Sequence, residues 1–174
     1  FSILLLVVTT LAWFSYNVNP EVNLLVTSVG KYQIDIKIEV SKNNQGYQEV
    51  QTEAEMAAIL DNTIPGDTYD FRLSFTNNGT SNAYIDVVFD NIINIPYQNS
   101  DANMLEVFLI DGTRLSELVN GGNSWYAAHE IHILQSETET FSFRLKYDEE
   151  TSDLKYQQGK IKINSITIYV NSEG

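Results

Sequence analysis

The chain has 174 residues, 43% of them hydrophobic and 11% aromatic, so it is long enough and apolar enough to bury a core of its own. Against 23 Asp and Glu residues it has only 10 Lys and Arg residues, and the net charge of −13 repels phosphate backbones and excludes nucleic acid as an expected partner. Because there is no Cys, disulfides and thiolate metal sites are excluded, and we expect no cofactor.

The chain begins with an uncharged apolar run that resembles the core of a signal peptide. It is shorter than the roughly twenty residues of a membrane span, and small residues at Thr10 and Ala12 have the spacing that signal peptidase prefers. We therefore predict cleavage between Ala12 and Trp13, so that residues 1–13 are the end of a leader that meets the membrane only transiently. An N-terminal membrane anchor and a buried strand of the domain are the alternatives.

Residues 14–22 are expected to form an extended arm ahead of a domain over residues 23–171. Residues 15–20 within it are polar and rich in Asn, and Asn19-Pro20 disfavours a helix. A disordered terminus, or a segment that pairs within its own subunit, is the alternative.

The first part of the domain is expected to hold a strand and a short helix. Between residues 32 and 40, apolar side chains at every second position alternate with polar ones, which is typical of a half-buried strand. Helix formers over residues 52–60, with Thr52 and Glu55 spaced as a capping box, predict about two helical turns.

Residues 64–90 read as a central hairpin. Pro65 and Gly66 suit the two central positions of a tight turn before Asp67, and residues 69–75 alternate between apolar and polar. Asn77, Asn78 and Gly79 accept left-handed conformations, and an apolar return strand follows over residues 84–89.

The remainder of the chain predicts further strands. We expect a polar loop over residues 91–103, a strand over 105–110, one helical turn within 113–119, a long strand that includes Ile131, Ile133 and residues 141–147, and a last strand over 161–170 before a tail at 172–174. A change of phase at Asn164-Ser165 suggests a bulge or irregular register. Together these elements predict an all-β, antiparallel sandwich with one or two short helices.

Two features are candidates for chemistry or binding. The only histidines are in His129-Glu130-Ile131-His132, one residue short of the i, i+4 spacing that places two ligands on one face of a zinc-binding helix. We therefore expect surface histidines and no catalytic residues. Trp125 and Tyr126 either pack the end of the sandwich or bind a partner.

Three segments resemble the TasA and camelysin family in the same order. They are Thr10-Leu11-Ala12-Trp13-Phe14-Ser15 after the apolar run, then Ile64-Pro65-Gly66-Asp67 followed by a strand and Asn77-Asn78-Gly79-Thr80-Ser81, and finally Lys155-Tyr156-Gln157-Gln158-Gly159 before the last strand.

The resemblance implies a jelly-roll-like sandwich, secreted by a Gram-positive type of bacterium, that assembles into extracellular biofilm-matrix fibres, with accessory subunits as further partners. It also implies that the freed arm fills the sheet of the next subunit, with Phe14, Tyr16, Val18 and Val22 as donor residues. The alternatives are a monomeric cell-surface binding module of the same fold and a camelysin-like metallopeptidase that uses His129 and His132.

Overall fold

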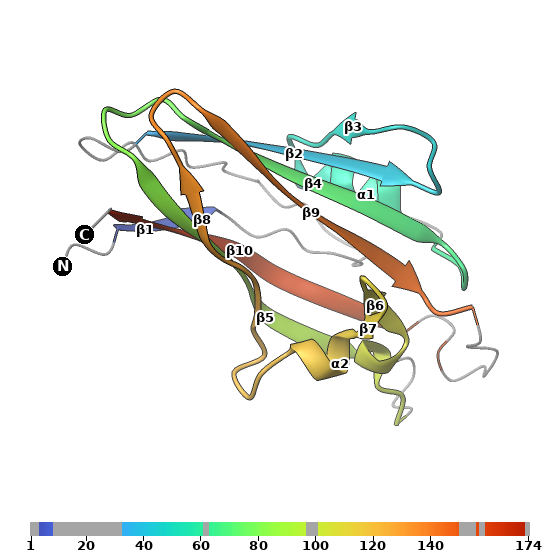
Figure 1. Ribbon diagram of the computed structural model, residues 1–174. Helices are drawn as coiled ribbons and strands as arrows, with labels where there is room; N and C mark the ends of the chain where they lie inside the picture. Colours follow the sequence, from blue (N-terminus) through green and yellow to red (C-terminus); the bar gives the residue numbers. More distant parts are fainter. Residues whose placement is uncertain are drawn as a thin grey trace.

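The computed structural model describes residues 4–8, 33–60, 63–96, 101–149, 156 and 159–172, which form two antiparallel sheets packed face to face (Figure 1). One sheet has the strand order β1-β10-β5-β8, with bounds Leu4–Val8, Lys160–Ser172, Ala83–Ile95 and Trp125–Ile133. The other has the order β3-β2-β4-β9-β6-β7, with bounds Gln48–Glu49, Ile34–Lys42, Thr68–Asn77, Thr138–Tyr147, Phe108–Ile110 and Thr113–Arg114. The predicted all-β sandwich is confirmed.

The core lies between the sheets and follows the alternation of the sequence. In β4 every second residue from Tyr69 to Asn77 is buried, which is the period-two pattern of a strand with one face on the core. Aromatic rings join the two layers. The ring of Phe143 on β9 stacks on Phe71 at 4.8 Å and meets Phe89, from the opposite sheet, edge to face at 5.5 Å.

Two short helices accompany the sheets. The helix α1 (Glu53–Leu60) has the predicted capping box, since the amide of Glu55 donates to Oγ1 of Thr52 at 3.2 Å and Oε2 of Glu55 accepts from the amide of Thr52 at 3.0 Å. The second helix, α2 (Leu115–Leu118), is a single turn after β7. The expected helical turn within residues 113–119 therefore occupies only part of that range.

The predicted central hairpin is wrong, because β4 and β5 lie in different sheets. β4 is flanked by β2 and β9, so neither of its edges is free for β5. Asn77, Asn78 and Gly79 have no positive φ and link the layers instead. The buried Asn77 side chain donates to the carbonyl of Ser81 at 2.9 Å and to that of Ile133, in the other sheet, at 3.3 Å.

Three other expected elements have different bounds. Residues 91–95 continue β5 instead of opening a loop, and the strand expected over 105–110 begins as the 3-10 helix η2 (Met104–Glu106) before β6. The long strand expected to join Ile131 to Tyr147 is two strands, β8 and β9, separated by a turn. Ser172, expected as the first residue of a tail, is the last residue of β10, and the rest of the expected tail lies outside the described residues.

Near Asn164, where an irregularity was expected, the alternation of buried residues changes phase while the pairing of β10 with β5 keeps its register. Ile163 pairs with Ile92 and Ser165 with Asp90, so the pairing of β10 with β5 keeps step. In β5 the buried residues Phe89 and Ile92 are three positions apart, and Asn91 between them has a φ of +53°. The left-handed residue shifts the alternation by one position and lets both ends of the strand face the core.

Candidate functional site

The outer edge of β10 is completed by a segment from the far N-terminal end of the chain. β1 runs antiparallel to β10 through five consecutive pairs, from Leu4 opposite Val170 to Val8 opposite Ile166 (Figure 1). On its other side β10 pairs with β5 along nearly its whole length. A strand taken from the start of the sequence therefore closes this side of the four-stranded sheet.

The two faces of β10 differ sharply along this edge. Ile166, Ile168 and Val170 are buried in the core. On the opposite face, Oγ1 of Thr167 donates to Oδ2 of Asp90 at 2.6 Å. Burial raises the pKa of Tyr169 on that face, and the charge of Asp90 raises it further. A strand added here meets an apolar layer on one face and polar groups on the other.

On the polar face of the four-stranded sheet, Asp86 of β5 contacts both neighbouring strands, β8 and β10. Its Oδ1 accepts from Nδ1 of His129 and from the amide of Glu130, both at 2.7 Å, and its Oδ2 accepts from Nδ2 of Asn171 at 3.2 Å. Glu130 has a φ of +53°, and the β5–β8 register shifts between Ile85 and Val87. The Asp86 carboxylate therefore anchors a β-bulge in β8.

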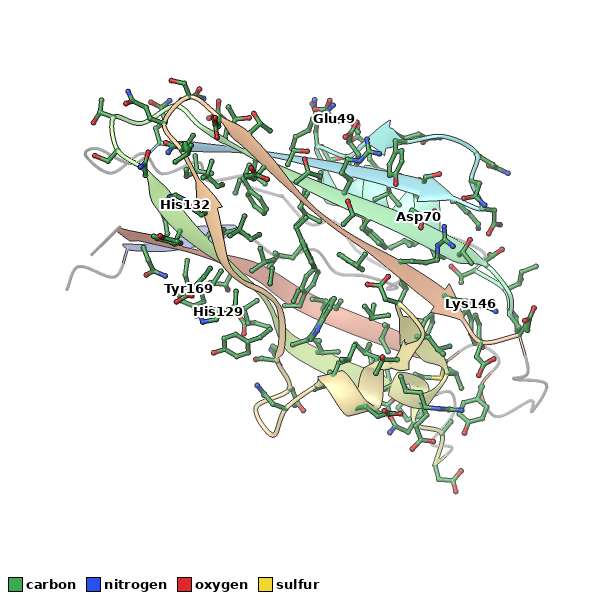
Figure 2. All side chains as sticks on the ribbon, in the orientation of Figure 1. Glu49, Asp70, His129, His132, Lys146 and Tyr169 are labelled. Carbon is green, nitrogen blue, oxygen red and sulfur yellow. The ribbon has the colours of Figure 1, made fainter. Side chains whose placement is uncertain are left out.

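The two histidines of the sequence lie on this bulged strand. His129 is largely exposed beside Asp86, whereas the ring of His132 stacks on Tyr84 at 4.7 Å (Figure 2). Within the described residues, no three His, Cys, Asp or Glu side chains are grouped so as to hold a metal ion. Both histidines are exposed residues of β8.

The neighbouring aromatic pair divides between core and surface. Trp125 is buried and stacks on Phe89 at 5.0 Å, so it packs the sandwich as one of the two alternatives predicted. Tyr126 is 63% exposed on the face that carries His129. Of these two residues, Tyr126 is the one exposed enough to contact a partner.

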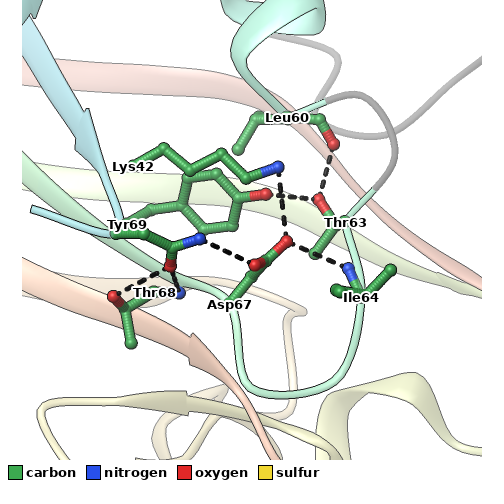
Figure 3. Close-up of polar contacts among 8 residues, drawn as sticks. Lys42, Leu60, Thr63, Ile64, Asp67, Thr68 and Tyr69 are labelled. Carbon is green, nitrogen blue, oxygen red and sulfur yellow. Dashed lines mark hydrogen bonds and ion pairs between the residues drawn. The ribbon is translucent and has the colours of Figure 1, made fainter. Parts of the chain in front are cut away.

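The turn at Pro65, Gly66 and Asp67 has the predicted geometry and joins three segments (Figure 3). Gly66 has a φ of +95°, and the amide of Asp67 donates to the carbonyl of Ile64 at 3.0 Å. The Asp67 carboxylate accepts from Nδ2 of Asn43 at 2.8 Å and from the amide of Ile64 at 3.0 Å, and it lies 3.3 Å from Nζ of Lys42. This turn is structural, since its polar groups are engaged with one another.

A shallow hollow of about 500 Å³ on the outer face of the six-stranded sheet was not indicated by the sequence. Arg144 lines it and is already engaged, with Nε 2.6 Å and Nη2 3.0 Å from the two carboxylate oxygens of Asp70. The guanidinium of Arg144 in this hollow is therefore already neutralised by the Asp70 carboxylate.

The remaining predicted site residues lie outside the described part of the chain. They are the cleavage pair Ala12 and Trp13 and the donor residues Phe14, Tyr16, Val18 and Val22. The edge of β10 itself was not predicted, because alternation reveals a strand but not its neighbours. Its only sequence signal is the apolar alternation of Ile166, Ile168 and Val170.

The described residues define an antiparallel β-sandwich in which one side of β10 is paired with an N-terminal strand of the same chain. Comparisons with protein-family models, curated proteins and solved structures find no match. Among the described residues, no helix has the length and apolar character needed to cross a membrane.

Proposed function

We propose that this protein is a secreted structural subunit that assembles into extracellular fibres by donor-strand exchange of its N-terminal arm. The observation that supports the proposal is the pairing of Leu4–Val8 with β10: an extended N-terminal segment already completes an edge of this sandwich. Donor-strand exchange needs such an edge and a segment that reaches a neighbour. Residues 14–22 follow shortly after β1 and have the composition of an extended arm.

Strand addition suits the composition of this chain. An added strand gains main-chain hydrogen bonds whatever its side chains are, so a polar arm with few apolar residues is sufficient. The net charge of −13 makes subunits repel one another, which disfavours large side-chain interfaces. A short contact made by main-chain hydrogen bonds is favoured instead. Pro20 lacks an amide donor, so it removes one hydrogen bond from any strand that the arm adds.

A monomeric cell-surface binding module is the second candidate function. The exposed ring of Tyr126, together with Tyr84, His129 and His132, gives the four-stranded sheet an aromatic and polar outer face of the kind that holds a ligand by stacking. A metallopeptidase is the third, and it requires ligands beyond the two histidines.

Electron microscopy and circular dichroism of an arm-deleted variant test the fibre proposal. We expect a chain lacking residues 14–21 to stay folded by circular dichroism and to form no fibres. Fibres of normal appearance from this variant would exclude donor-strand assembly, whereas a folded monomer from the intact processed chain would favour the binding module.

A matched pair of arm variants shows whether the arm acts as a strand. Tyr16→Asn places an amide among the apolar positions of the arm and is expected to slow fibre formation by about tenfold or more, because a buried polar group without a partner is costly. Ser15→Asn places the same amide on the neighbouring polar position and should assemble at a rate within about twofold of the unsubstituted chain, as expected of an exposed site. Equal loss in both variants would contradict a strand with two distinct faces.

A further inference from the structure

We propose that Asn120 is a site of spontaneous deamidation, at which the amide nitrogen of Gly121 closes a ring on the Asn120 side chain and water opens it to aspartate or isoaspartate. This modification goes beyond the proposed function and is independent of it, because the reaction needs only the folded turn and water. The site lies in the loop between α2 and β8.

The sequence contains two Asn-Gly pairs, Asn78-Gly79 and Asn120-Gly121. Asparagine is among the chemically labile residues of proteins, and a following glycine favours ring closure because it has no Cβ to crowd the attacking nitrogen. The sequence alone therefore makes the two pairs equivalent. Both asparagines are exposed to solvent, so the hydrogen bonds around them must distinguish them.

Asn120 opens a tight turn that leaves the attacking nitrogen unused. The amide of Asn123 donates to the carbonyl of Asn120 at 2.9 Å, which places Gly121 and Gly122 at the two central positions. Such a turn makes no use of the amide at its first central position. Within the described part of the chain, the exposed Gly121 amide has no hydrogen-bond acceptor. The nucleophile is therefore available.

The same turn activates the side chain that would be attacked. The amide of Gly122 donates to Oδ1 of Asn120 at 3.0 Å, which folds the carboxamide back toward the backbone of the turn. Oδ1 is also the atom that becomes negatively charged when a nitrogen adds to Cγ. A backbone donor already aimed at a developing oxyanion lowers the barrier to an acyl transfer.

At the other Asn-Gly pair the corresponding groups are engaged. The amide of Gly79 is buried and donates to Oδ1 of Asn77 at 3.0 Å, so the nucleophile is held. Nδ2 of Asn78, which would leave as ammonia, donates to Oδ2 of Asp35 at 2.5 Å. Both hydrogen bonds must break before the ring can close, so the fold protects Asn78.

Water is the only co-reactant of the reaction at Asn120. The Gly121 nitrogen gives its proton to a solvent base and forms a bond to Cγ, the bond from Cγ to Nδ2 breaks, and ammonia leaves with a proton from water. Water then adds to the ring. Addition at Cγ gives aspartate, whereas addition at the main-chain carbonyl carbon gives isoaspartate. Either product replaces the amide by a carboxylate and makes the chain more acidic.

Peptide mapping by mass spectrometry tests this proposal on the unsubstituted chain. The folded protein is kept for weeks at slightly alkaline pH, and samples are digested with trypsin, with a zero-time digest as the background. Trypsin cuts after Arg72, Arg114 and Arg144, so Asn78 and Asn120 fall in different peptides.

We expect faster conversion in the peptide of residues 115–144 than in that of residues 73–114. The gain of about 1 Da at Asn120 should be about tenfold or more faster than the same gain at Asn78, because two hydrogen bonds oppose the reaction there. Fragment spectra assign the change to Asn120, and labelling with isoaspartate methyltransferase measures the isoaspartate product.

Two controls separate the effect of the turn from that of the sequence. In urea, where the turn is lost, both Asn-Gly pairs should convert at rates within about twofold of each other. Gly121→Ala fits the fold, because a Cβ there meets no atom within 4 Å and Gly121 has no positive φ. Its methyl group crowds the nitrogen, so conversion at Asn120 in the folded variant should slow by about tenfold.

Each outcome decides for or against the proposal. Faster conversion at Asn120 in the folded chain, with similar rates at the two pairs after unfolding, supports it. Equal rates in the folded chain, or no conversion at Asn120 while the unfolded chain converts, overturns it. A preference for Asn120 that persists in urea also overturns it, because the sequence and not the turn would then set the rate.

Discussion

The Asp67 carboxylate fastens the start of β4 to two neighbouring segments, and its removal tests how much stability this turn supplies. The side chain is 9% exposed and accepts from Asn43 and from the amide of Ile64. Asp67→Ala removes two part-buried hydrogen bonds, at about 0.5 to 1.5 kcal/mol each, because Asn43 and Ile64 are exposed and water can replace the lost acceptor. Lys42 also loses a counterion, but it is partly exposed, so solvent reduces that contribution to about 0.5 kcal/mol. The expected loss in the free energy of unfolding is about 2 kcal/mol.

Urea unfolding followed by circular dichroism and tryptophan fluorescence measures this loss. Asp67→Asn keeps one acceptor oxygen and the shape of the side chain, so we expect it to cost about half as much as alanine. Asp101→Ala removes the same group from an exposed loop and should change stability by less than about 0.5 kcal/mol. The reasoning is refuted if Asp67→Ala is no more destabilising than Asp101→Ala.

The pH dependence provides a second check on the sign of the electrostatic contribution. Burial alone would raise the pKa of Asp67, but the hydrogen bonds from Asn43 and Ile64 and the ion pair with Lys42 outweigh it and hold the pKa below its usual value. A lowered folded pKa stabilises the protein above the unfolded pKa, and this contribution disappears as the pH falls through the folded value. The difference between Asp67→Asn and the unsubstituted chain should therefore stay constant from pH 7 to about 5 and shrink below about pH 4.

Three further predictions concern packing, the histidines and the net charge. A Cβ at Gly159 would collide with the side chain of Met104, which is fully buried, so Gly159→Ala should lower the free energy of unfolding by about 1 to 3 kcal/mol in urea, and by less when Met104→Ala makes room. His129→Ala with His132→Ala should leave circular dichroism and fibre assembly intact; a metal-dependent casein cleavage that this double variant loses would contradict the structural role. Fibre formation followed by light scattering should be faster at about 300 mM NaCl than at about 20 mM, because salt screens the charge of −13, and salt-independent kinetics would count against self-repulsion as the barrier.

The sequence predicted individual strands well because each strand signals itself locally. The alternation over residues 69–75 appears in β4 as alternating burial, and the spacing of Thr52 and Glu55 appears as a capping box. Both features depend only on residues that are neighbours along the chain, where side-chain period and hydrogen-bond reach are fixed by backbone geometry.

Strand partners were harder to predict because sheet membership depends on contacts that are distant in sequence. Asn77, Asn78 and Gly79 have the composition of a hairpin turn, yet β4 already has β2 and β9 as neighbours, and the chain crosses to the other sheet. The bond from Asn77 to the carbonyl of Ile133 stabilises this crossing and has no local signature. For the same reason the edge position of β10 could not be read from Ile166, Ile168 and Val170.

The position of the arm relative to β10 determines what kind of polymer the proposed exchange produces. In the proposed exchange each subunit would offer one donor segment and one acceptor edge, and these would be different surfaces of the same chain, so the contact would be heterologous. A heterologous contact forms a ring only if its rotation closes, and otherwise it propagates as an open filament. Residues 19–33 connect the proposed donor segment to β2, and the proposed exchange requires this stretch to reach beyond its own sandwich. One cut between Ala12 and Trp13 would both vacate the edge and release its next occupant, so filament growth would follow processing without a rearrangement of the sandwich itself.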